Sequence, residues 1–329
     1  MTIRLGILGL GSMGRHHVRN ARATEGVELV ALADLAGDRF GVAPPLEVLP
    51  GVEDLIAAGI DAAIVAVPTA FHEEAALLLA EAGVHTLVEK PLSVSVESGR
   101  RIAEAFERAD LVGAVGYVER CNPALVEMRR RIAQGQLGEV YQIVTRRQSP
   151  FPARISDVGV VKDLATHDVD LASWVVGAPY EMVFAQVGYR SGRVHEDLLL
   201  ASGRFANGVL VNHQVNWLTP YKDRTTIVIG EHGALVADTA MGDLSFYENG
   251  SSPLQWEQIA AFRGVSEGTV TRYALDKREP LAVEHEHFRD AILGRGGEHV
   301  SMAEGVRTLE VLEGILESAR TGQAIRFSE

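Results

Sequence analysis

The sequence contains a single cysteine and no apolar run of membrane-spanning length. Cys121 cannot form a disulfide within its own chain, which agrees with a reducing compartment and a structural role for the thiol. The longest apolar runs, such as residues 62–67, fall far below the ~20 residues that a helix needs to cross a bilayer. The first residues lead straight into an apolar strand, without the charged and apolar regions of a secretory signal. We therefore expect a cytoplasmic protein with no membrane partner.

Positive charge is also scarce. The 31 Lys and Arg residues against 44 Asp and Glu residues give a net charge of −13. This field repels nucleic acid and anionic membranes, so an anionic substrate would need arginines close to its site. At 329 residues the chain is long enough for two domains, and its composition leaves no room for a long disordered region.

The first 115 residues alternate short apolar runs with helix-like segments. The apolar runs lack polar alternation, which is typical of parallel strands covered by helices on both faces. We expect strands at 3–8, 27–33, 62–67, 86–88 and 111–115, and helices at 12–23, 69–82 and 95–109. This repeat predicts an α/β domain with a doubly wound parallel sheet over residues 1–120.

The remaining residues, 121–329, have a different character and predict an α+β domain. A helix at 123–134 and a strand at 140–147 are followed by β-type runs between residues 182 and 248. Ala206-Asn207-Gly208 and Glu231-His232-Gly233 are typical of hairpin connections, so this sheet is expected to be antiparallel. The closing helices are expected at 282–293 and 302–321, the second starting at a capping box, and they could pack back on the first domain.

The loop Gly9-Leu10-Gly11-Ser12-Met13-Gly14 directly follows the first predicted strand and opens a helix. In this context a G-x-G-x-x-G run predicts a dinucleotide-binding Rossmann domain. Gly9 permits the tight turn, Gly11 lets the pyrophosphate approach the backbone, and Gly14 allows the helix to pack on the strand. The first amides of the helix, around Ser12 and Met13, would bind phosphate.

Asp34 ends the second predicted strand, 20 residues beyond Gly14. A carboxylate there can accept hydrogen bonds from the adenosine ribose hydroxyls and repels a 2′-phosphate, which predicts NAD rather than NADP, although Arg39 lies within reach. The alternative is that Asp34 only caps a helix. Pro68 and Thr69 end another strand at the same edge of the sheet and are expected to border the cofactor, whereas His72 is interpreted as a helix-surface or capping residue.

Glu89-Lys90-Pro91 ends a further parallel strand, at the edge that faces the cofactor. We count Glu89 and Lys90 among the cofactor-binding residues. A lysine beside a nicotinamide can stabilise a developing alkoxide, and Pro91 would fix the backbone. Asp163 and His167 are four residues apart on a predicted helix that runs to about residue 176, so they share a face and could form an acid/base pair. A capping aspartate with a buried structural histidine is the alternative.

The glycine loop, Glu89-Lys90-Pro91 and the spacing of Asp163 and His167 together resemble the glucose-fructose oxidoreductase and inositol dehydrogenase (Gfo/Idh/MocA) family. The resemblance covers nearly the whole chain. It implies a nicotinamide-binding first domain and a second domain with an open, mostly antiparallel sheet that forms homodimers or homotetramers. It also implies that Lys90, Asp163 and His167 are catalytic, with the histidine as proton acceptor.

Residues 116–124 and 154–161 are most similar to family members that act on the 3-hydroxyl of nucleotide-activated amino sugars. Tyr117, Arg120, Asn122 and Arg154, together with Lys90 and His167, are therefore expected to bind substrate. The two arginines could hold a phosphate or carboxylate through forked hydrogen bonds, or they could form salt bridges.

No metal site is expected. Glu284-His285-Glu286-His287 spreads its side chains around one helix and is interpreted as a solvated face, and His16 and His17 are interpreted as structural. The predicted function is that of an NAD-dependent oxidoreductase that oxidises a secondary alcohol of a sugar, cyclitol or sugar derivative. An inositol or free-sugar dehydrogenase is the alternative within this class. A non-catalytic NAD sensor is the alternative outside it, against which Lys90, Asp163 and His167 argue.

Overall fold

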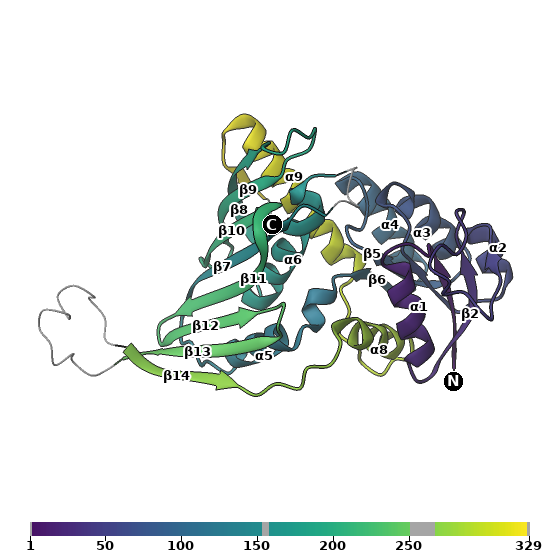
Figure 1. The fold of residues 1–329 in the computed structure, drawn as a ribbon, viewed down its shortest axis with the longest axis horizontal. Coiled ribbons are helices and arrows are strands. Elements are labelled where there is room, and N and C mark those ends of the chain that lie inside the picture. Colours follow the sequence, from purple (N-terminus) through teal and green to yellow (C-terminus); the bar gives the residue numbers. More distant parts are fainter. Residues whose placement is uncertain (1, 153–157, 251–266, 328–329) are drawn as a thin grey trace, which may run out of the picture. The chain divides into compact units, whose positions relative to one another are not determined.

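The chain folds into two compact units, each with its own sheet (Figure 1). The computed structural model describes residues 2–152, 158–250 and 267–327. Unit 1 consists of Met1–Val118 and Glu279–Glu313, and unit 2 consists of Glu119–Arg278 and Gly314–Glu329. No helix in the described ranges combines the length and the apolar character that crossing a membrane requires.

Unit 1 is built on a parallel sheet with the strand order β3-β2-β1-β4-β5-β6. The strands are β1 (Ile3–Leu8), β2 (Val27–Ala33), β3 (Val48–Leu49), β4 (Ala62–Val65), β5 (His85–Glu89) and β6 (Gly113–Gly116). The strand order reverses between β1 and β4. Ligands of doubly wound sheets bind outside the carboxyl ends of the strands at such a reversal, so this edge is the expected binding place.

Helices flank this sheet, and α8, which comes from the C-terminal part of the chain, packs against α1 (Figure 1). The helices of unit 1 are α1 (Gly14–Ala23), α2 (Val52–Ala57), the 3-10 turn η1 (Thr69–Phe71), α3 (His72–Glu81), α4 (Val96–Arg108), α8 (Pro280–Ile292) and the first part of α9 (Met302–Thr321). Phe288 of α8 is buried in the same apolar cluster as Ile3, Leu5 and Ile7 of β1. The capping box of α9 is present, because Ser301 and Glu304 each donate a backbone N–H to the other's side chain.

Unit 2 contains a mixed sheet with the strand order β14-β13-β12-β11-β7-β10-β9-β8-β15. Its strands are β7 (Val140–Pro150), β8 (Tyr180–Gly188), β9 (Leu198–Phe205), β10 (Leu210–Asn216), β11 (Leu218–Gly230), β12 (Gly233–Asp238), β13 (Asp243–Asn249), β14 (Glu267–Tyr273) and β15 (Ile325–Arg326). The β9–β10 and β11–β12 hairpins form at the two predicted turns. Among the described strands of this second sheet, only β7 and β10 pair in parallel, so the sheet is mostly antiparallel.

One face of this sheet is buried under the helices of unit 2. The helical segments of unit 2 in the described ranges are the 3-10 turn η2 (Val118–Cys121), which starts at the boundary of the units, α5 (Pro123–Ala133), the π-helical turn η3 (Val161–Ala165), α6 (Thr166–Val176) and the last part of α9. Arg147 of β7 is 4% exposed, and its Nε and Nη1 lie 2.9 Å from Asp168 Oδ1 and 2.8 Å from Glu119 Oε1. Buried charge pairs thus hold α6 and η2 on the sheet.

The predicted fold class is confirmed. The sequence interpretation missed β3 and α2, because a two-residue strand and a six-residue helix give almost no periodic signal. It also ran a single helix from residue 69, whereas the structure begins with η1 and starts α3 at His72.

Candidate functional site

The glycines between β1 and α1 have two different functions. Gly9 has a φ of +95°, and a Cβ there would lie 2.7 Å from the backbone of Ala66, which follows β4. A Cβ on Gly14 would lie 1.9 Å from the carbonyl oxygen of Gly9. On Gly11, by contrast, a Cβ would meet no described atom within 4 Å. Gly9 and Gly14 therefore allow close backbone packing, while Gly11 leaves space for a ligand to approach the main chain.

The helix that follows this loop presents its first amides to the same space. Met13 immediately precedes α1 and makes no capping hydrogen bond through its side chain in the described structure. Ser12 and Gly11 are exposed. The first amides of a helix have no acceptor within the helix and carry its positive dipole end, so this loop suits a phosphate group.

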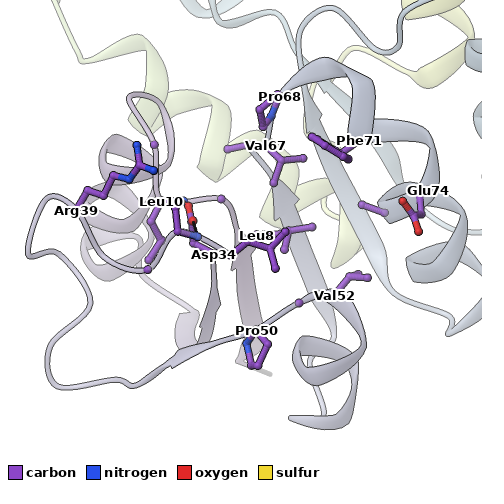
Figure 2. A pocket seen from close by; sticks show the side chains of 18 of the residues that line it. Leu8, Leu10, Asp34, Arg39, Pro50, Val52, Val67, Pro68, Phe71 and Glu74 are labelled. Atoms are coloured by element: carbon purple, nitrogen blue, oxygen red, sulfur yellow. Dashed lines mark hydrogen bonds between the residues drawn. The ribbon is translucent and has the colours of Figure 1, made fainter.

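A cavity of about 540 Å³ opens beside the glycine loop (Figure 2). Of the predicted cofactor-binding residues, Gly9, Gly11, Asp34 and Pro68 line it. The other predicted cofactor-binding residues do not line it: Ser12, Met13, Gly14, Thr69, Glu89 and Lys90. The volume lies in the range of ordinary ligand sites.

Leu35 and Phe71 also line this cavity and were missed from the sequence. A signal for them exists in the sequence, because each is a bulky apolar residue shortly after a predicted parallel strand. In the structure they are 93% and 54% exposed, and exposed apolar side chains at a ligand-binding edge provide apolar contacts for a ligand. Arg39 lines the same cavity and is exposed.

Asp34 follows β2, and its carboxylate lies next to the glycine loop (Figure 2). Its Oδ2 accepts the N–H of Leu10 and its Oδ1 accepts the N–H of Ala36, each at 2.7 Å. No described helix starts beside it, so the alternative of a helix cap does not apply. Each carboxylate oxygen can accept a further hydrogen bond, and the ribose hydroxyls of adenosine are suitable donors. The glycines, the amides of α1 and Asp34 therefore fit a dinucleotide.

Lys90 leaves the same sheet at the same edge. β5 ends at Glu89, and β1, β4 and β5 are adjacent and parallel, so their carboxyl ends lie together. Lys90 is half-buried, and the Lys90–Pro91 peptide is cis. His72 lies beneath this edge and is 1% exposed, so its interpretation as a surface or capping residue is wrong. Its ring nitrogens lie 2.9 Å from the carbonyl oxygen of Val67 and 3.1 Å from that of Pro91, which joins two of the edge loops.

A buried cluster of titratable side chains lies behind the end of β5. Nε2 of His17 lies 2.9 Å from Oε1 of Glu89, and Nδ1 of His17 lies 2.9 Å from Nε2 of His285. Glu284 is also buried. The interpretation of residues 284–287 as a solvated face is therefore wrong for Glu284 and His285, because α8 packs that face against α1.

Burial sets the protonation of this cluster. It raises the pKa of Glu284 well above its usual range, and the nearby charge of Glu89 adds to the effect. Burial also lowers the pKa of His285 to about 3, with a further contribution from His17. Glu284 therefore favours its neutral acid form, and His285 is a neutral imidazole at ordinary pH.

In unit 2, Asp163 and His167 lie on one continuous helical segment. Asp163 is in the π-helical turn η3 and is buried, while His167 is in the first turn of α6 and is half-buried. The π-helical turn was not predicted, because residue spacing does not distinguish it from an α-helix. Such turns occur frequently at functional sites. Lys90 belongs to unit 1 and these two residues to unit 2.

The predicted substrate-binding residues have contacts of their own. Nε and Nη2 of Arg120 donate to Asp170 at 2.9 and 2.6 Å, which is the predicted salt-bridge alternative. Asn122 caps α5 by accepting the N–H of Ala124, and its amide donates to the carbonyl of Thr239. Tyr117 is 1% exposed, and Arg154 lies outside the described residues. Their binding of substrate stays a prediction. In the described parts of the chain, no group of three or more acidic, histidine or cysteine side chains could hold a metal ion.

Two family models match the chain. Residues 3–117 match an oxidoreductase family with an NAD-binding Rossmann fold, and residues 125–236 match the GFO/IDH/MocA C-terminal domain. The chain belongs to the GFO/IDH/MocA oxidoreductase family. The predicted family, enzyme class and cofactor are thereby confirmed, and this member is an oxidoreductase with an NAD-binding Rossmann domain.

Proteins similar to this chain include two bacterial dehydrogenases. The scyllo-inositol 2-dehydrogenase (NAD(+)) of Bacillus subtilis (strain 168) is 27% identical over 99% of this chain and 96% of its own. The UDP-N-acetylglucosamine 3-dehydrogenase of Acidithiobacillus ferrooxidans is 29% identical over 88% of each chain, and its solved structure has a TM-score of 0.85 over 97% of each. The structure of GenD2 from gentamicin A biosynthesis in complex with NAD has a TM-score of 0.82 at 25% identity, and covers 100% of this chain and 97% of its own.

Replacing Asp34 by Ala should weaken NAD binding and reduce its preference over NADP. The substitution removes an ionic acceptor for the ribose hydroxyls and for the Leu10 amide, a loss of about 1.5–3 kcal/mol, or roughly 10- to 100-fold in affinity. Fluorescence titration with NADH and NADPH measures both constants. Asp38→Ala is the control, since Asp38 is in the same loop but accepts the Ala43 amide. An unchanged NADH affinity in Asp34→Ala would contradict the assignment.

Glu284→Gln should stabilise unit 1 more at pH 8 than at pH 5. The folded state holds the proton of Glu284 at pH values where the unfolded chain has released it, so the wild type loses stability as pH rises above about 4.5. Each unit of elevated pKa contributes about 1.4 kcal/mol. Thermal unfolding across this pH range checks the prediction, with Glu286→Gln on the same helix as the control. A pH-independent difference between Glu284→Gln and wild type would refute it.

Proposed function

We propose that this protein oxidises a secondary alcohol on a sugar, a cyclitol or a sugar derivative, or reduces the corresponding ketone. The observation that carries the proposal is the position of Lys90, which leaves β5 at the same sheet edge as the glycine loop and Asp34. A lysine there can stabilise negative charge on the oxygen of an alcohol undergoing oxidation. A sensor that only bound NAD would have no use for this group.

Three side chains carry the proposed chemistry. Bound NAD supplies the hydride acceptor. His167 takes the hydroxyl proton as the carbon beside it loses hydride, and Asp163 orients the imidazole. Lys90 stabilises the developing alkoxide through its ammonium group. The alcohol thus loses one hydride and one proton and becomes a ketone, and reduction runs through the same groups in reverse.

The relatives support a polyhydroxylated substrate. One is named for scyllo-inositol and another for UDP-N-acetylglucosamine, and both are dehydrogenases. We propose the 3-hydroxyl of a nucleotide-activated amino sugar as the specific candidate, and an inositol or free sugar as the alternative. Tyr117, Arg120, Asn122 and Arg154 are the proposed substrate-binding residues. Arg120 would have to exchange its bonds with Asp170 for bonds to an anionic group of the substrate.

Lys90→Met and His167→Ala should each abolish most turnover without removing NAD binding. Loss of a general base costs roughly 10²- to 10⁴-fold in rate, and loss of one group that stabilises developing charge costs roughly 10²- to 10³-fold. NADH formation is measured on a panel of inositols, free sugars and nucleotide sugars, and NADH affinity is measured separately by fluorescence. Lys277→Met is a matched control, because Lys277 is exposed and bonded to Asp243. Near-native turnover in His167→Ala would show that the base is another residue.

We further propose that the open face of the unit 2 sheet joins copies of the chain into a homodimer or homotetramer. Leu210, Ile229, Tyr247 and Val270 are 52%, 37%, 47% and 58% exposed. They belong to the strands β10, β11, β13 and β14 and lie opposite one another across the sheet. Gln142 of β7 pairs with both Leu210 and Ile229, and Ala234 of β12 pairs with both Ile229 and Tyr247. Tyr247 in turn pairs with Val270. Side chains in register share a face, so these residues form one row that is apolar except at Gln142. A row of this kind favours a protein partner over water.

The double variant Leu210→Lys/Ile229→Lys should shift the protein towards a monomer. Two buried ammonium groups at the contact would have no partner, and copies would repel each other. Light scattering coupled to size-exclusion chromatography measures the molar mass. Val194→Lys is the control, because Val194 is 89% exposed but lies in the loop after β8. An unchanged oligomer in the double variant would place the interface elsewhere.

A further inference from the structure

The buried cluster of unit 1 holds Glu89 at both carboxylate oxygens. The N–H of Lys90 donates to Oε2 at 3.1 Å, and Nε2 of His17 lies 2.9 Å from Oε1. His17 is fully buried and Glu89 is 7% exposed, so little water can replace these bonds. One oxygen is therefore held by the main chain of Lys90 and the other by helix α1.

The charge of Glu89 determines which group donates in each of these hydrogen bonds. Burial alone would raise the pKa of Glu89, but the hydrogen bond and charge of His17, together with the charge of Lys90, hold the pKa below its usual range. The carboxylate is therefore ionised and can only accept hydrogen bonds. His17 must donate from Nε2.

His285 contacts the other ring nitrogen of His17. The ring of His285 stacks on that of His17, with the centroids 5.2 Å apart, and its Nε2 faces Nδ1 of His17. His285 is a neutral imidazole with one N–H and one bare nitrogen, so its Nε2 can hydrogen-bond to Nδ1 of His17 in either direction. One chain of hydrogen bonds thus runs from His285 through His17 to Glu89.

We propose that His17 and His285 are positioning residues for Lys90, acting through Glu89 to fix the main chain from which the lysine side chain extends. The inference rests on the catalytic role proposed for Lys90. It also links two parts of the cofactor site, because His17 lies on α1 three residues after Gly14 and Glu89 ends β5. The helix that begins at the glycine loop and the strand that carries the lysine are thereby joined by one chain of bonds.

Packing alone does not explain this cluster. A buried carboxylate has to be compensated by donors, whereas an apolar side chain at the same place would require none. The neighbouring strand also leaves room for the charge, since a Cβ on Gly116 of β6 would lie 3.3 Å from Cδ of Glu89. Strand, helix and neighbouring glycine are thus all arranged around one charged group beside Lys90.

Variants of His17 test this inference through rescue. His17→Leu removes the donor to Glu89 and should lower kcat by about 100-fold, the effect of a misplacement of about 1 Å at a reacting group. His17→Gln places an amide N–H near the position of Nε2 and should recover at least about tenfold of that loss. The affinity for NADH should change by less than about threefold in both, because neither variant alters the glycine loop.

His16→Gln is the matched control on the same helix and should keep the wild-type kcat, since His16 is not part of the chain of bonds. The inference is overturned if His17→Leu retains kcat, or if His17→Gln is as impaired as His17→Leu. It is also overturned if kcat falls only in proportion to a loss of folded protein, measured by thermal unfolding of each variant.

Nitrogen NMR of the imidazoles provides a test that needs no substrate. In the wild type, His17 should carry a proton on Nε2, and its Nδ1 should show the chemical shift of a hydrogen-bonded nitrogen, which His285→Leu should abolish. A bare Nε2 on His17 would refute the chain of bonds. The activity of Lys90→Met separates the two proposals. If that variant is active, the proposed function fails, whereas if it is inactive and His17→Leu is not, only the present inference fails.

Discussion

The close approach of backbone to backbone around the glycine loop is the constraint on which the cofactor site depends. Gly14 sits against the carbonyl of Gly9, and Gly9 in turn sits against Ala66, so the start of α1 is locked to the exits of two neighbouring strands. No side chain fits between them. The direction of the helix amides, the open space at Gly11 and the reach of Asp34 all follow from this contact.

In both units, buried charged side chains, and not apolar packing alone, fix the position of a proposed catalytic residue. In unit 1 the ionised Glu89 lies between His17 and the amide of Lys90. In unit 2 Arg147 of the sheet binds Asp168, the residue after His167. Removing one member of such a pair leaves a charge stranded away from water, which is why these contacts define positions more sharply than an apolar contact of similar size.

Local patterns allowed much of this structure to be predicted from sequence. Apolar runs, hairpin turns, the capping box and the glycine loop each depend on residues close in the chain, and each has the expected form. What depends on distant packing could not be predicted. The burial of His285 requires α8 to lie on α1, and the bond between Arg120 and Asp170 joins residues 50 positions apart. The π-helical turn at Asp163 has the same apolar spacing in the sequence as an α-helix, so it could not be predicted.

The carboxylate of Asp34 contacts both the glycine loop and the cofactor cavity. It accepts the amide of Leu10 inside the glycine loop, and it faces the cavity where the ribose of NAD is expected. Replacing Asp34 to admit a 2′-phosphate would also remove the acceptor of the Leu10 amide in the glycine loop. Cofactor preference and loop geometry are therefore coupled through a single side chain.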